Sequence, residues 1–213
     1  MLPAFEDPEH CAVDPFLIAA DLSADAVLAY HSALEVQGRA YSSFNEVQFV
    51  SRRRMQPFEF RGTRYRPLTA SPALVRAGCV DFGVEPIDRA GSAVQVTGLE
   101  RTLVDALDRP DLCGGWEEVW RSLEMVEYLN LQTVCDYALA LGNATTVAKT
   151  GWYLEAHRES LMVEDSILEA LRQNIPASPH YLSRGSTEPT RYLSNWNLVV
   201  PRSLLDRHWE EPQ

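Results

Sequence analysis

The stretch Val96-Thr97-Gly98-Leu99-Glu100-Arg101-Thr102-Leu103-Val104-Asp105 contains the point at which a strand pattern gives way to a helix pattern. Upstream of it, segments of alternating apolar and polar residues are typical of β-strands with one buried face. From Gly98 onward, the apolar residues recur at the spacing of one helix face: Leu99, Leu103, Val104 and Leu107. This order predicts an α+β fold, with a small mixed or antiparallel sheet and a C-terminal portion like a helical bundle.

The helical half is expected to contain several helices. The first begins after Thr97, its expected N-cap, and ends at Arg109-Pro110-Asp111, because the residue before a proline disfavours helix. The second begins at Gly115. The further expected segments are helices over about 131–141, 144–159 and 163–173, a Gly142 stop, an Asn143 N-cap and a strand over Trp196–Val200.

The N-terminal half is expected to supply the sheet. A helix is predicted over 24–37, with Ser23 as its N-cap and Gly38 as its stop. The predicted strands that follow are 46–51, a hairpin over 58–67 that turns at Gly62, and two strands over 79–87 and 93–96. Residues 1–21 are expected to form an irregular lead-in, and residues 22–213 one α+β domain.

Composition narrows the class of protein. The chain has 213 residues, of which 46% are hydrophobic and 23% charged, a balance that suits a globular protein with a sizeable core. No apolar run is long enough to span a bilayer, so no membrane partner is expected. The first residues lack the basic and apolar regions of a secretory signal, which favours a cytoplasmic location.

The residues that usually mark catalytic or metal sites are scattered. The cysteines at 11, 79, 113 and 135 form no Cys-x-x-Cys pair, and the histidines are isolated in the sequence. A single histidine among apolar residues, such as His31, is more often structural than a metal ligand or a base. With no Walker loop, dinucleotide fingerprint or Ser-His-Asp spacing, we expect no cofactor, no metal and no enzymatic activity.

The charge is unevenly distributed. The formal net charge is −11, yet the segment 52–66 holds six arginines and one acid, Glu59, and so carries +5 and leaves −16 for the remaining chain. Such a segment favours either a solvated β-ribbon or a surface that contacts DNA phosphates or a partner protein. The candidate contact residues are Arg52, Arg53, Arg54, Arg61, Arg64 and Arg66.

Within the quoted stretch, the residues alone favour an amphipathic helix. Glu100, Arg101 and Asp105 are then expected to be solvated, with Arg101 and Asp105 paired at i, i+4. A nuclease-like carboxylate pair of Glu100 and Asp105 is an alternative. Downstream, Gly114-Gly115 is interpreted as a turn that opens the next helix.

A later helix carries Gly151-Trp152-Tyr153-Leu154-Glu155. Glycine is unfavourable inside a helix, so Gly151 is expected to permit close packing. Trp152 and Tyr153 are expected in the core, with an exposed partner contact as the alternative.

Four motifs in this order resemble the AbiEi family of abortive-infection antitoxins. They are the helix Tyr30-His31-Ser32-Ala33-Leu34-Glu35, the helix Glu100-Arg101-Thr102-Leu103-Val104-Asp105, the Gly114-Gly115 pair and the helix Trp152-Tyr153-Leu154-Glu155. The positions that carry the family motifs are Glu100, Arg101, Asp105, Gly114, Gly115, Trp152 and Glu155. The resemblance covers about residues 22–156 and matches the C-terminal antitoxin domain of that family, without its N-terminal winged helix.

The resemblance implies a bacterial type IV toxin–antitoxin system of the AbiE kind, active in phage defence. The chain would neutralise a nucleotidyltransferase-like toxin and contribute to transcriptional autoregulation at promoter DNA. Two alternatives stay open from the residues: a DNA-binding transcriptional regulator that acts through the basic hairpin Arg52–Arg66 without a toxin role, and a degenerate nuclease-like enzyme that uses Glu100 and Asp105.

Overall fold

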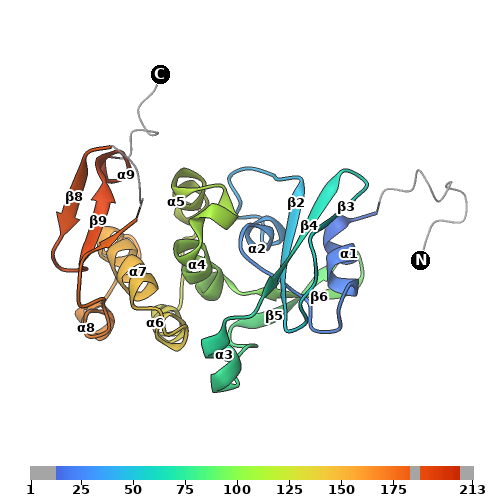
Figure 1. Cartoon of the computed structure of the whole chain (residues 1–213), viewed down its shortest axis with the longest axis horizontal. Helices are drawn as coiled ribbons and strands as arrows, with labels where there is room; N and C mark the ends of the chain where they lie inside the picture. Colours follow the sequence, from blue (N-terminus) through green and yellow to red (C-terminus); the bar gives the residue numbers. More distant parts are fainter. Residues whose placement is uncertain (1–12, 183–187, 207–213) are drawn as a thin grey trace, which may run out of the picture.

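The computed structural model describes residues 13–182 and 188–206, and a six-stranded sheet dominates its N-terminal half (Figure 1). The strand order is β3-β4-β2-β1-β6-β5. The β1–β6 and β2–β4 pairs are parallel and the other pairs antiparallel, so the sheet is mixed. The strands are β1 (Val27–Leu28), β2 (Glu46–Ser51), β3 (Phe58–Phe60), β4 (Thr63–Thr69), β5 (Val84–Arg89) and β6 (Ser92–Thr97).

The predicted helix over 24–37 is wrong in its first half. Val27 and Leu28 form β1 in the middle of the sheet, and the helix α2 spans only His31–Val36. Both β1 residues are buried, and β1 lies between β2 and β6 in the sheet. Tyr30 makes the abrupt change from strand to helix with a φ of 56°, a backbone region that is rare outside glycine.

The predicted lead-in also contains a helix. α1 (Pro15–Asp21) begins with a proline in its first turn, and the Asp14 carboxylate accepts a hydrogen bond from the Phe16 amide at 2.9 Å. This helix packs on β2 and β6, where Phe16 and Ala19 are buried. Residues 1–12 of the predicted lead-in lie outside the described part of the chain.

The predicted hairpin over 58–67 is confirmed, and the two strands expected over 79–87 and 93–96 pair as a second hairpin. Arg61 and Gly62 have φ values of 50° and 76°, and Ala90 and Gly91 have φ values of 52° and 81°, as two-residue hairpin turns with positive φ at both positions require. The strand expected from residue 79 begins only at Val84. The short helix α3 (Pro72–Ala77), which lies between the hairpins, was not predicted.

The helical half follows the predicted order closely. Its helices are α4 (Leu99–Asp108), the 3-10 turn η1 (Pro110–Cys113), α5 (Trp116–Glu124), α6 (Leu131–Ala140), α7 (Ala144–Ala156) and α8 (Asp165–Arg172). The expected Asn143 cap is confirmed, because its side chain accepts a hydrogen bond from the Thr145 amide. Thr97 is not the N-cap of α4; Gly98 is, and Thr97 ends β6.

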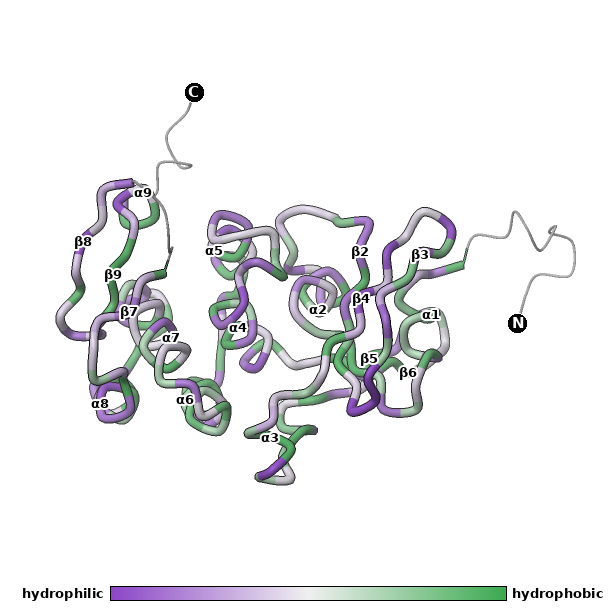
Figure 2. Tube along the Cα trace, viewed as in Figure 1, coloured by the Kyte–Doolittle hydropathy of each residue, from purple (hydrophilic) through white to green (hydrophobic). Residues whose placement is uncertain are grey.

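A second, three-stranded sheet closes the C-terminal end (Figure 1). Its order is β7-β9-β8, and its elements are β7 (His180–Tyr181), β8 (Thr190–Leu193), β9 (Leu198–Pro201) and the following helix α9 (Arg202–Leu205). The strand expected over 196–200 is β9, which begins two residues later because Asn197, with a φ of 49°, belongs to the turn. All of β9 is buried and hydrophobic, whereas β8 is mostly exposed and hydrophilic (Figure 2).

The core consists of two clusters. The larger lies among the helices and reaches β9, and the smaller lies between α1, α2 and the six-stranded sheet. Together with the two sheets they confirm the predicted α+β fold. Among the described residues, no helix combines the length and apolar character needed to cross a membrane.

Candidate functional site

Arg101 and Asp105, which were expected to be solvated, are buried. Their exposed fractions are 3% and 5%, and Arg101 Nε lies 3.4 Å from Asp105 Oδ2. Arg101 Nη1 also donates to the carbonyl oxygens of Val80 and Phe82, at 2.7 and 2.8 Å. Tyr137 on α6 donates its hydroxyl to Asp105 Oδ1 at 2.8 Å. The pair therefore joins α4 to α6 and to the segment between α3 and β5.

Burial raises the pKa of Asp105 to about 6, although Arg101 and Tyr137 act in the opposite direction. The pair borders a pocket of about 250 Å³ that Tyr30 and Asn143 also line. Glu100 is directed elsewhere, because its Oε1 accepts a hydrogen bond from the Asn130 amide at 2.9 Å. The structure therefore shows no shared contact between Glu100 and Asp105, the carboxylate pair considered for a nuclease.

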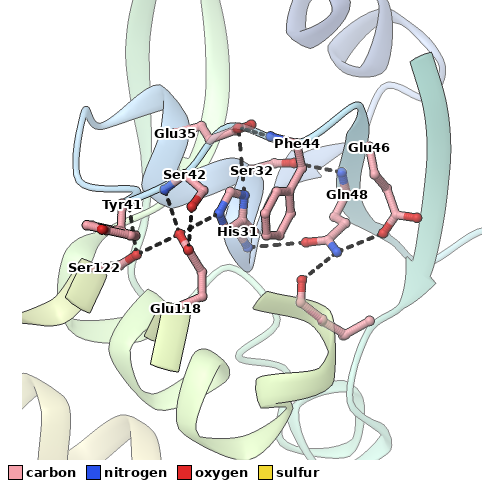
Figure 3. A network of polar contacts seen from close by, with 11 residues as sticks. His31, Ser32, Glu35, Tyr41, Ser42, Phe44, Glu46, Gln48, Glu118 and Ser122 are labelled. Atoms are coloured by element: carbon pink, nitrogen blue, oxygen red, sulfur yellow. Dashed lines mark hydrogen bonds and ion pairs between the residues drawn. The ribbon is translucent and has the colours of Figure 1, made fainter. Parts of the chain in front are cut away.

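A second buried network centres on His31 at the start of α2 (Figure 3). Its Nε2 lies 3.2 Å from Glu118 Oε1 and its Nδ1 lies 3.8 Å from Glu35 Oε1. Glu118 also accepts hydrogen bonds from the amide and the hydroxyl of Ser42, at 2.8 and 2.7 Å. The network ties α2 to α5 and to the loop before β2. Glu118 and Ser42 were not singled out from the sequence, since no motif marks them.

The Gly114-Gly115 pair lies beside this network. Gly114 and Gly115 have φ values of 79° and 98°, so the interpretation as a turn is confirmed. A Cβ atom at Gly114 would lie 2.6 Å from Phe44 Cζ. Phe44 in turn stacks on the His31 ring with a centroid distance of 3.7 Å. Two of the sequence motifs, far apart in the chain, therefore meet at Phe44.

The motif on α7 is also internal. Trp152 is 6% exposed and its ring contacts the rings of Trp116 and Trp120, which confirms the expected core position. Glu155 accepts hydrogen bonds from Arg172 at 2.6 Å and from the indole of Trp196 at 2.7 Å. These contacts fasten α8 and the β8–β9 turn to α7.

Half of the six candidate arginines are engaged by carboxylates. Arg64 and Arg66 both face Glu46 at 3.5 Å, and Arg52 lies 3.1 Å from Asp81 Oδ2. The Arg61 guanidinium lies over the ring of Phe60. Arg53 and Arg54 are exposed, and the described part of the chain holds no ion pair to either.

The arginines do not form one compact patch. Arg52, Arg53 and Arg54 follow the C-terminal end of β2, whereas the Arg61 turn lies beyond its N-terminal end, where Glu46 pairs with Arg64. A six-residue strand separates the two groups by roughly 17 Å at about 3.3 Å per residue. Arg53 and Arg54, between β2 and β3, therefore carry positive charge that no carboxylate of the described residues pairs with.

Comparison with known proteins adds a structural neighbour. No protein-family model and no curated protein matches the chain. Among solved structures, the chain is similar to the crystal structure of the RV2827C protein from Mycobacterium tuberculosis, with a TM-score of 0.63 and 16% sequence identity. The match covers 94% of this chain and 72% of that chain. At this identity the likeness establishes a shared fold.

Proposed function

We propose that this chain is the antitoxin of a bacterial type IV, AbiE-like toxin–antitoxin system and counters a nucleotidyltransferase-like toxin. The observation that carries the proposal is that the four motif segments meet in one packed unit. The first and third motifs meet at Phe44, and Asp105 of the second borders the pocket that Tyr30 also lines. Trp152 of the fourth contacts α5, the helix that the Gly114-Gly115 turn opens.

In this arrangement the motif residues pack within the fold and do not form a contact surface for a partner. Arg101, Asp105 and Trp152 are buried, and Glu155 is bonded to Arg172 and Trp196. A partner therefore has to be recognised by other residues. We assign that role to Arg53 and Arg54, because arginine without a carboxylate neighbour retains its full capacity for carboxylate or phosphate.

The experiment is growth rescue in a bacterial host. The proposal expects a nucleotidyltransferase-like protein to be encoded next to this chain, and that protein is expressed with and without it. We expect the chain to restore growth and the Arg53→Glu, Arg54→Glu double variant to lose the rescue. Arg76→Glu is the control for the single variants Arg53→Glu and Arg54→Glu, because it changes the charge by the same amount and Arg76 is an exposed arginine on α3 with no ion pair in the described structure.

The outcomes separate the two parts of the proposal. Failure of the folded natural chain to rescue growth from a toxic partner contradicts the antitoxin function. Rescue by both the natural chain and the double variant retains that function and contradicts the assigned contact. Equal loss in the Arg76→Glu control shows that the assay responds to net charge alone, which also removes the assignment.

A DNA-binding regulator is the second candidate, and the same two arginines favour it. Its expected salt dependence is weak, because Arg52, Arg64 and Arg66 are already engaged by Asp81 and Glu46. Two phosphate contacts give a slope of log K against log salt of about −2, whereas six arginines give about −5. Titration of the upstream DNA over a range of salt concentrations measures this slope.

A further inference from the structure

A groove of about 360 Å³ lies between α7 and the edge strand β8, at the opposite end of the molecule from the arginines of the β2–β3 loop (Figure 1). Its lining includes the consecutive residues 191–196 and, from α7, Trp152, Glu155 and Ala156. Side chains on a strand alternate between its two faces. Arg191–Leu193 of β8 and the following residue, Ser194, all line this groove. Because consecutive residues of a strand do not all project from one face, the backbone edge of β8 faces the groove.

That edge has no strand beside it in the described part of the chain. β8 is the last strand in the order β7-β9-β8, and within the described residues it pairs with β9 alone. Unpaired amide and carbonyl groups on an edge strand are a template for an added strand. Extended peptides bind many domains in this way, with main-chain hydrogen bonds for affinity and side-chain pockets for specificity.

The floor of the groove is apolar and firmly held. Trp152 and Trp196 are 6% and 1% exposed, and the Trp196 ring packs against Gly151 of α7. The Glu155 carboxylate, the acidic group on this wall, accepts hydrogen bonds from both Trp196 and Arg172. Little of either ring is accessible, and the exposed aromatic side chain that lines the groove is Tyr192, which is 49% exposed.

Two exposed arginines lie at the end of the groove. Arg191 lines both the groove and an adjoining hollow that Arg202, Leu205 and Asp206 complete. Arg191 and Arg202 are exposed, and neither forms an ion pair within the described residues. In a chain with a net charge of −11, two such arginines beside an open strand edge favour a ligand that carries a carboxylate.

We propose that this groove binds an extended, acidic segment of a partner protein, which pairs with β8 as a fourth strand. Its carboxylate would contact Arg191 and a neighbouring apolar side chain would contact the ring of Tyr192. The open backbone edge favours a peptide over a nucleic acid, because phosphodiester chains make no strand hydrogen bonds. This inference does not rest on the antitoxin function.

The test titrates acetyl-Glu-Val-Glu-Val-amide into the full chain labelled with ¹⁵N. We expect amide shifts at residues 190–196 and 151–156. Two matched peptides separate the forces: one N-methylated at alternate amides, which cannot pair as a strand, and one with lysine in place of glutamate. Each is expected to bind at least about tenfold more weakly, the loss that corresponds to about 1.4 kcal/mol. A dT oligomer is expected to cause no shifts at these residues.

Two charge-reversal variants locate the site. Arg191→Glu is expected to weaken binding of the acidic peptide by about tenfold or more, and Arg76→Glu on the remote helix α3 by less than about twofold. Equal binding of the N-methylated peptide, equal losses in both variants, or no shifts at millimolar peptide would overturn the proposal. A full-length Glu210→Lys, Glu211→Lys variant that binds the peptide much more tightly would identify the chain's own C-terminal residues as the occupant and contradict a partner segment.

Discussion

Gly151 of α7 lies against the indole ring of Trp196. A Cβ atom at position 151 would overlap the ring atoms Cζ3, Cη2 and Cε3, far inside van der Waals contact. Trp196 is 1% exposed, and Glu155 of the same helix holds its indole nitrogen. The glycine is therefore the residue that allows the β8–β9 turn to dock on α7.

We predict that Gly151→Ala destabilises the protein despite its better helix propensity. Alanine improves the helix by about 1 kcal/mol. Overpacking against a fixed ring costs more, so the expected net loss is about 2 kcal/mol in the free energy of unfolding. Urea denaturation measures it. In a Trp196→Leu background the overlap is relieved, and the same change is expected to be neutral or stabilising; a loss of equal size there would contradict the packing explanation.

The helical half was predictable because its signals are local. The four-residue recurrence of apolar positions and the Asn143 cap depend only on neighbours in sequence, and both match the structure. The helix over 24–37 failed for the opposite reason. Ser23 and Asp25 look like a helix start, but the Asp25 carboxylate instead accepts hydrogen bonds from Ser51 and the Arg52 amide. A two-residue strand such as β1 is defined by its partners in the sheet.

The site was less predictable than the fold. Arg101 and Asp105 at i, i+4 match the pattern of a solvated ion pair, and their burial comes from Tyr137 and the carbonyls of residues 80 and 82, which lie far away in sequence. The sequence shows the arginine segment 52–66 only as a local excess of positive charge. Its division into paired and unpaired members depends on Glu46 and Asp81, which tertiary structure brings to it.

The raised pKa of Asp105 predicts a specific pH dependence of stability. The folded value is about 6 because of burial, against 3.8 as the ordinary value, so the folded state binds more protons than the unfolded state between these pH values. The contribution of Asp105 to stability is therefore largest at low pH and falls as the pH rises from about 4 to about 6, by up to about 1.4 kcal/mol per pH unit.

The measurement compares the natural chain with Asp105→Asn across this range. The free energy of unfolding of the natural chain is expected to fall relative to that of the variant as the pH rises. Tyr137→Phe removes a hydrogen bond that lowers the pKa of Asp105, so an NMR titration of the carboxyl group is expected to show a higher value in that variant. A relative gain for the natural chain with rising pH would show that Arg101 outweighs burial.

Gly114 and Gly115 are predicted to differ in their tolerance of alanine. Gly114, with φ 79° and ψ 5°, lies in the left-handed region, which costs alanine about 1–2 kcal/mol, whereas Gly115, with φ 98° and ψ −178°, lies in a region that essentially only glycine adopts. A Cβ atom at Gly115 meets no atom within 4 Å, whereas at Gly114 it would lie 2.6 Å from Phe44 Cζ. Gly114→Ala is therefore expected to lower the thermal midpoint through the Phe44 contact, and Gly115→Ala through its backbone alone. Phe44→Leu is expected to reduce the loss caused by Gly114→Ala and to leave that of Gly115→Ala unchanged; an undiminished loss at Gly114 would refute the contact.

We predict that the contribution of Glu118 to stability falls at low pH, which is opposite to the pH dependence of the Asp105 contribution. Burial raises the pKa of Glu118, but the hydrogen bonds from Ser42 and His31 outweigh it and hold the pKa below the ordinary value of 4.5. A folded pKa below the unfolded value means that the stabilisation is present above about pH 4.5 and is lost as the pH falls through the folded pKa. The ion pair with His31 adds to it only while the imidazole is protonated.

Glu118→Gln tests this role, because it retains the shape and removes the charge. The variant is expected to lose about 2 kcal/mol at neutral pH, the scale of hydrogen bonds to a charged group, and to converge on the natural chain as the pH falls through the folded pKa of Glu118. Glu117→Gln is the matched control, since this neighbouring carboxylate is 55% exposed and pairs with Arg121 at the surface, where such pairs contribute about 0–1 kcal/mol. Denaturation at a series of pH values decides between the outcomes. A loss in Glu118→Gln that does not change with pH would show that the network acts through packing, with His31 stacked on Phe44, and that the charge of Glu118 contributes little.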